Sequence, residues 1–100
     1  MTLPTRVVLL TRAGCHLCET AQATIEGLCA QQRVGWRAID IDDDEALATR
    51  YTAHVPVVFV DGELHGYWFV DEAALRRDLV SGRPAPVDDS WQPPTNRELS

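Results

Sequence analysis

Two cysteines separated by two residues constrain this chain more than any other feature of its sequence. Cys15 and Cys18 follow a short apolar run at residues 7–10 and the glycine, Gly14, that ends it. A continuously apolar run of this length is typical of a strand covered on both faces of a sheet. An amphipathic pattern then begins near Cys15 and continues to about Gln32, which predicts a helix. The cysteine pair therefore lies where a buried strand gives way to a helix.

The rest of the chain predicts a compact α/β order. Strands are expected over residues 6–11, 36–41, 57–60 and 64–70, and helices over 15–32, 45–51 and 72–80. The acids at positions 42–44 would cap the second helix, Asp61-Gly62 is a strong hairpin signal, and Asp71 would cap the last helix. The resulting β-α-β-α-β-β-α order predicts a mixed four-stranded sheet with helices on both faces.

The length and the proline distribution set the expected domain organisation. One hundred residues is the size of a single compact domain, and residues 1–82 contain every predicted element. Residues 83–100 carry four of the six prolines, which predicts an extended tail. Within that tail, Trp91 is the residue best suited to docking on the domain.

The charge balance restricts the classes of partner. The chain has no lysine, and its nine arginines stand against fifteen acids, for a net charge of −6. Nucleic acids and anionic membranes are bound by basic surfaces, so neither is expected as a partner. As a separate expectation, the protein is a monomer. No signal-peptide pattern precedes the first strand, which favours the cytoplasm. In that reducing compartment, close cysteines are more often catalytic or metal-binding than structural.

The cysteine pair, a Val-Pro and the order of elements together resemble a known family. Cys15-His16-Leu17-Cys18 lies on a strand–helix junction, and Val55-Pro56 precedes a hairpin strand. With the minimal β-α-β-α-β-β-α order, these features are similar to those of glutaredoxin-like proteins of the thioredoxin superfamily, over about residues 6–80. The resemblance implies a nucleophilic Cys15, a resolving Cys18, and a cis-Pro56 facing the disulfide. It also implies that the Val55 backbone binds an extended substrate as an added strand. The implied strand order of the sheet is 2-1-3-4, with the third strand antiparallel.

The chain departs from glutaredoxins proper around this motif. His16 stands where many of them have proline, and Arg12 is the nearest cation where they have lysine. They also have two glycines and an acidic pair that hold the amino end of glutathione, whereas Gly66 here is followed by Tyr67-Trp68-Phe69. Glutathione therefore stays one option as reductant or substrate, and no tightly bound cofactor is expected. Arg12 would steer an anionic substrate or stabilise the Cys15 thiolate, unless it is simply solvated.

The residue types suit thiol–disulfide exchange, which needs an accessible thiolate and a second thiol. A helix N-terminus lowers the pKa of a thiol, and the three-residue spacing places Cys18 one turn further along the same face as Cys15. His16, if protonated, would add to this effect; the alternative is an exposed histidine with little influence. The predicted activity is reduction of disulfides in proteins or small thiols, with glutathione or a flavoprotein reductase as electron donor. A metal or iron–sulfur module and a non-enzymatic adaptor are the alternatives.

Other candidate residues have mainly structural interpretations. Cys29 should face the core on the same helical stripe as the other apolar residues, with a regulatory or metal-binding role as the alternative. His54 precedes Val55-Pro56 and should lie near the redox site, where it would carry protons or contact substrate, or simply lie on the surface. The aromatic residues at 67–69 are expected to pack on the last strand, with an apolar wall beside the redox site as the alternative.

Overall fold

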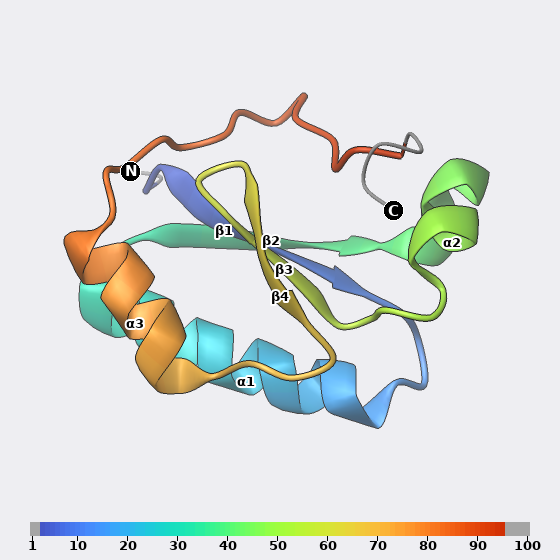
Figure 1. The fold of residues 1–100 in the computed structure, drawn as a ribbon, viewed down its shortest axis with the longest axis horizontal. Coiled ribbons are helices and arrows are strands. Elements are labelled where there is room, and N and C mark those ends of the chain that lie inside the picture. The colour runs from blue at the N-terminus through green and yellow to red at the C-terminus, as the bar shows by residue number, and fades with distance from the viewer. Residues whose placement is uncertain (1–2, 96–100) are drawn as a thin grey trace.

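A mixed four-stranded sheet separates two layers of helix (Figure 1). The structure is a computed structural model and describes residues 3–95. The strands are β1 (Thr5–Thr11), β2 (Gly35–Asp40), β3 (Val57–Val60) and β4 (Glu63–Tyr67). The helices are α1 (His16–Gln32), a 3-10 turn η1 (Ile41–Asp43), α2 (Glu45–Tyr51) and α3 (Glu72–Ser81). The sheet order is β2-β1-β3-β4, with β1 and β2 parallel and the other pairs antiparallel, which confirms the predicted fold class.

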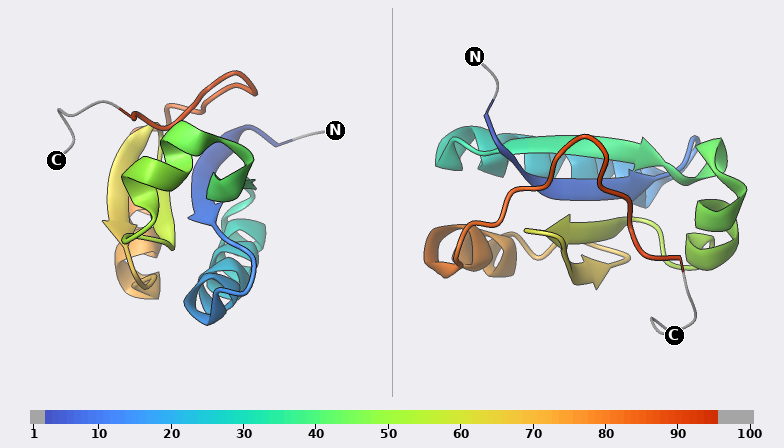
Figure 2. Two further views of the ribbon diagram at one scale, coloured as in Figure 1. Left: turned by 90° about the vertical axis from the view of Figure 1, so that its right-hand side faces the viewer. Right: turned by 90° about the horizontal axis from the view of Figure 1, so that it is seen from above.

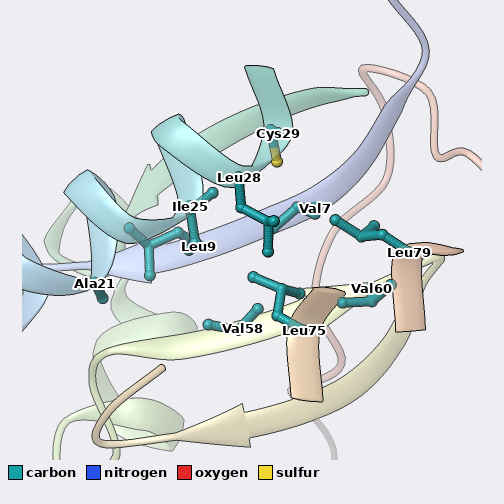
Figure 3. Packing of buried hydrophobic residues seen from close by; sticks show 10 residues of the cluster. All are labelled: Val7, Leu9, Ala21, Ile25, Leu28, Cys29, Val58, Val60, Leu75 and Leu79. Carbon is teal, nitrogen blue, oxygen red and sulfur yellow. The ribbon is translucent and has the colours of Figure 1, made fainter. Parts of the chain in front are cut away.

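The side-chain alternation of β1 builds two cores, one on each face of the sheet. Val7 and Leu9 face α1 and α3, where they pack with Ile25, Leu75 and their neighbours (Figure 3). Side chains at the intervening positions face α2, and the buried members of this second cluster are Val8, Leu10, Ile41, Leu47, Tyr51, Val57 and Phe59. Because both faces are covered, the strand reads as continuously apolar, as predicted.

Local capping explains where the elements begin and turn. The Asp44 side chain accepts hydrogen bonds from the first-turn amides of α2, and Asp71 does the same for α3. Asp61 and Gly62 both have positive φ, at 53° and 83°, which is the backbone of a tight two-residue hairpin between β3 and β4. These three predicted signals are confirmed.

The last strand is shorter than predicted. Residues 64–70 were expected to form it, but β4 ends at Tyr67 because Trp68 adopts a left-handed conformation with φ of 76°. The chain therefore leaves the sheet at Trp68 and turns toward α3 (Figure 1). As a result, Trp68 and Phe69 are 52% and 69% exposed, so the expectation that they pack on the strand is wrong. The second strand is also displaced by one residue, since Ile41 belongs to η1.

The described part of the predicted tail, residues 83–95, packs across the α2 face of the sheet (Figure 2). Val87 pairs with Thr5, its N–H donating to the Thr5 carbonyl at 2.9 Å. The ring of Trp91 packs edge-on against Phe59, with centroids 5.2 Å apart, and Arg37 Nη2 donates to the Trp91 carbonyl at 2.8 Å. Trp91 thus docks on the second core. Residues 96–100 of the tail lie outside the described residues.

One buried ion pair fastens the end of the molecule opposite the cysteines. Arg6 donates to both carboxylate oxygens of Asp61, at 2.9 and 2.8 Å, and to the Leu79 carbonyl at 3.0 Å. Asp61 also accepts from the Ala85 N–H at 2.9 Å. The side chains of Arg6 and Asp61 are only 7% and 12% exposed. This pair therefore joins β1, the hairpin, α3 and the tail.

The same pair makes stability depend on pH. The Arg6 hydrogen bonds hold the pKa of Asp61 below its usual value. Because the folded pKa is the lower one, this stabilisation is complete above the unfolded pKa, about 3.9, and is lost as pH falls through the folded pKa. We expect the free energy of unfolding, measured by urea titration from pH 7 to pH 2.5, to fall more steeply in the wild type than in Asp61→Asn. A similar slope in both proteins would contradict this, and Asp89→Asn at an exposed position is the control.

Candidate redox site

Cys15 and Cys18 are bonded as a disulfide at the start of α1, with their Cα atoms 5.2 Å apart. Cys15 is the N-cap residue, in an extended conformation, and its Sγ accepts a hydrogen bond from the Cys18 N–H at 3.1 Å. Cys15 is half-buried, whereas Cys18 is only 1% exposed. The cysteine at the helix end is therefore partly accessible to a reaction partner, whereas Cys18 is enclosed.

The loop before Cys15 brings the cysteine to the end of β1. The Cys15 N–H donates to the Arg12 carbonyl at 3.3 Å, which closes a turn over Ala13 and Gly14. Gly14 has a φ of 76°, a conformation that favours glycine, and a Cβ there would meet nothing within 4 Å. The glycine is needed for the backbone direction of the loop rather than for space.

The Val55–Pro56 peptide bond is cis and lies at the same end of the sheet. Leu10 pairs with Val57, so the next position along each strand places Pro56 beside Thr11, at the start of the loop to Cys15. Pro56 is buried, Val55 is half-buried, and the Pro56 carbonyl accepts from the Trp68 N–H at 2.7 Å. Sheet pairing thus brings the predicted residues of the Val-Pro segment to the end of the sheet that carries the cysteine pair.

Arg12 lies in this loop, but its guanidinium is already engaged. It donates twice to the Asp42 carboxylate, at 3.0 and 2.9 Å, and once to Thr52 Oγ1 at 2.8 Å. The two bonds to Asp42 hold the pKa of its carboxyl below its usual value. Together with the bond to Thr52, they connect the loop to both ends of the η1–α2 segment. Neither partner is Cys15, so the predicted role of Arg12 toward thiolate or substrate stays a prediction.

His16 and Leu17, between the two cysteines, both point into solvent. The His16 side chain is fully exposed, with Nδ1 3.3 Å from a Glu19 carboxylate oxygen. Leu17 is 57% exposed and therefore contributes an apolar side chain to the surface around Cys15. The structure places both beside the disulfide, and the predicted electrostatic effect of His16 stays a prediction.

A group of aromatic side chains lies on the Val-Pro side of the site. The sequence pattern alone does not assign its position there. Tyr67 contacts His54 and Trp68 edge-on, with ring centroids 5.3 and 4.8 Å away. Trp68 Nε1 donates to the Ala53 carbonyl at 3.0 Å, which fixes the indole on the loop before Pro56. The signal in the sequence is three consecutive aromatic residues directly after Gly66, which sheet register brings to this end.

Cys29, the third cysteine, lies outside the site. It is 1% exposed within the core shared by α1 and β1, as predicted (Figure 3). Burial raises its pKa to about 11, so at neutral pH it is a thiol rather than a thiolate. Nucleophilic chemistry at neutral pH therefore rests on the pair at the helix start.

Neither a metal cluster nor a membrane span is found in the described part of the chain. Within residues 3–95, no three His, Cys, Asp or Glu side chains are grouped so that they could hold a metal ion. Across the same residues, no helix is both long enough and apolar enough to cross a bilayer.

The sheet order and a helix that starts at a cysteine pair define a thioredoxin-type fold. The sequence matches the family described as "Glutaredoxin-like domain (DUF836)" over residues 6–80, and the chain belongs to that family. An uncharacterized protein of Mycobacterium tuberculosis is 35% identical over 80 residues, which cover 75% of this chain and 82% of that protein.

Several solved structures are similar to this chain in sequence and fold. The structural genomics target protein XcR50 from X. campestris is 34% identical with a TM-score of 0.60, over 75% of this chain and 96% of that one. Protein Ne2328 from Nitrosomonas europaea is 31% identical with a TM-score of 0.61, over 75% and 91%. A mutant thioredoxin from Halobacterium salinarum is 32% identical with a TM-score of 0.54, over 77% and 74%. The fold and the cysteine pair at bonding distance support a redox-type function.

Proposed function

We propose that this protein is a thiol–disulfide oxidoreductase that reduces disulfides in proteins or small molecules through Cys15 and Cys18. The observation that carries the proposal is the unequal exposure of the two bonded cysteines, with Cys15 partly accessible at a helix N-terminus and Cys18 enclosed. Such an arrangement separates an attacking thiol from a resolving thiol.

The reduced protein would act in two exchange steps. The Cys15 thiolate attacks one sulfur of the substrate disulfide, a bond forms between Cys15 and that sulfur, and the other substrate sulfur leaves as a thiolate that takes a proton from water. Cys18, once deprotonated, then attacks Cys15 Sγ and releases the second substrate thiol. The substrate gains two electrons, and the protein returns to the bonded form seen in the structure.

The contacts of Cys15 support its assignment as the attacking thiol. The Cys18 N–H hydrogen bond and the positive end of the α1 dipole both favour a negative charge on its sulfur. The substrate would bind against Val55 and Pro56. The side chains of His16 and Arg12 would set the charge around the bound substrate. The protein would act as a monomer in the cytoplasm. It would need no tightly bound cofactor or metal, and no nucleic-acid or membrane partner.

A redox titration tests the activity. Protein equilibrated in glutathione buffers of graded potential is quenched with acid, its free thiols are alkylated, and the products are counted by mass spectrometry. We expect one two-electron transition between about −270 and −120 mV, the span of thioredoxin-fold oxidoreductases. Glutathione or a flavoprotein reductase would then be compared as electron donor. A pair that never equilibrates with the buffer would contradict the proposed activity.

A further inference from the structure

The surface around Cys15 differs in chemistry on its two sides. On the β4 side, Tyr67, Trp68 and Phe69 are 41%, 52% and 69% exposed. Leu17, which lies between the two cysteines on α1, is a further exposed apolar side chain beside the disulfide. An exposed cluster of large apolar side chains marks an interaction site more often than a random surface. Aromatic residues, together with Met and Arg, are also enriched at interaction surfaces. We name these four residues the aromatic rim.

Within the aromatic rim, Trp68 is held in place by the backbone of the Val-Pro segment. Trp68 donates its N–H to the Pro56 carbonyl and its indole N–H to the Ala53 carbonyl. Its left-handed conformation turns the chain out of the sheet, so that Phe69 follows as the most exposed large apolar side chain described. An indole held in this way is suited to binding because little of its side-chain freedom is lost on contact.

On the β2 side, the same end of the sheet is acidic. Thr11 pairs with Asp40, so the segment after β2 lies beside the loop that carries Cys15. Exposed carboxylates follow there at Asp42, Asp43, Asp44 and Glu45. Arg12 neutralises one of them, Asp42, through its bidentate pair. The remaining carboxylates, those of Asp43, Asp44 and Glu45, give this side a negative charge. We name these three residues the acidic rim.

We propose that the substrate of the redox site is a cysteine-containing polypeptide segment with apolar or aromatic side chains on one side of its disulfide and Lys or Arg on the other. This inference rests on the proposed function. The apolar side chains would cover the aromatic rim, and the basic side chains would face the acidic rim. Glutathione disulfide carries four carboxylates and no large apolar group, so it matches neither rim.

Four disulfides of graded chemistry test this substrate class. The reduced full chain is mixed at low salt with a disulfide-linked peptide carrying Phe and Lys around its cysteine, with the same peptide carrying Phe and Glu, with glutathione disulfide, and with bis(2-hydroxyethyl) disulfide. We expect the Phe–Lys peptide to react about tenfold faster than the Phe–Glu peptide, and that ratio to shrink in 0.5 M salt. Exchange with none of the four would overturn the proposed function itself. Equal rates for both peptides, or glutathione disulfide as the fastest, would overturn only the substrate class.

Variants test the contribution of each rim to the exchange rate. Phe69→Ser should slow the Phe–Lys peptide several-fold, whereas Val80→Ser, at a 63% exposed position on α3, should leave all rates unchanged. The double variant Asp43→Asn/Glu45→Gln should reduce the ratio of the two peptide rates, whereas Asp89→Asn should not. A stable dimer that Phe69→Ser dissociates, together with equal peptide rates, would show that the aromatic rim contacts a second copy, and would overturn the proposal.

Discussion

Replacing Cys15 with serine should abolish thiol–disulfide exchange while the fold is retained. Serine is a favoured N-cap residue, so its hydroxyl can take over the hydrogen bond from the Cys18 N–H and α1 should still begin at residue 16. The hydroxyl is not ionised at neutral pH and cannot form a disulfide, so exchange should fall by roughly two orders of magnitude or more, to the uncatalysed rate. The rate of bis(2-hydroxyethyl) disulfide reduction measures the loss, and circular dichroism checks the fold.

Two companion variants separate the role of Cys15 from those of the other cysteines. Cys18→Ser should still form the first mixed disulfide but should not release it, so mass spectrometry should show a protein that carries one substrate thiol. Cys29→Ala should exchange as the wild type does, because that thiol is enclosed in the core. Equal activity in the Cys15→Ser, Cys18→Ser and wild-type proteins would rule out the mechanism.

Asp61→Asn is expected to cause the largest loss of stability among the charge substitutions considered. The change leaves the Arg6 guanidinium buried without its counter-charge, and removing one partner of a buried ion pair typically costs about 3–5 kcal/mol. Asparagine tolerates the positive φ of position 61, so the hairpin itself should persist. Urea unfolding at pH 7 measures the free energy of unfolding.

A double variant separates the buried charge from the rest of the loss. Arg6→Met/Asp61→Asn removes both charges and keeps an unbranched apolar side chain in β1, so it should be more stable than Asp61→Asn alone. If the double variant loses as much as the sum of the two single variants, the ion pair has no coupling energy and this account of the buried pair is wrong.

The elements are well predicted from the sequence because local patterns define them. The apolar run of β1, the Asp61-Gly62 turn and the Asp44 and Asp71 caps depend on neighbouring residues, and each is found where it was expected. The end of β4 was missed because the pattern of residues 64–70 continues past Tyr67. Only the backbone conformation of Trp68 stops the strand, and a left-handed tryptophan has no signature in composition.

Contacts between distant segments do not follow from local patterns. The charge of Arg12 is evident in the sequence, but its pairing with Asp42 joins residues 30 positions apart, and no local pattern indicates which carboxylate it meets. The prolines predicted an extended tail with Trp91 as its docking residue, but no local pattern indicated that Trp91 would meet Phe59 and Arg37, both far away along the chain. Such contacts depend on the assembled sheet, so they follow from the fold.

The path of residues 83–95 determines at which end of the molecule a polypeptide fused after Thr95 would begin. The segment starts at the end of α3, crosses the α2 face of the sheet and reaches α2, where the Pro94 carbonyl accepts a hydrogen bond from the Tyr51 hydroxyl (Figure 2). Because α2 follows the end of β2 that lies beside the Cys15 loop, a polypeptide fused after Thr95 would emerge on the reactive side of the molecule. A disulfide-containing polypeptide fused there through a short flexible linker would have an effective concentration on the order of millimolar at Cys15. Fusion before Leu3, which lies beside Gly35 at the start of β2, would place it at the opposite end.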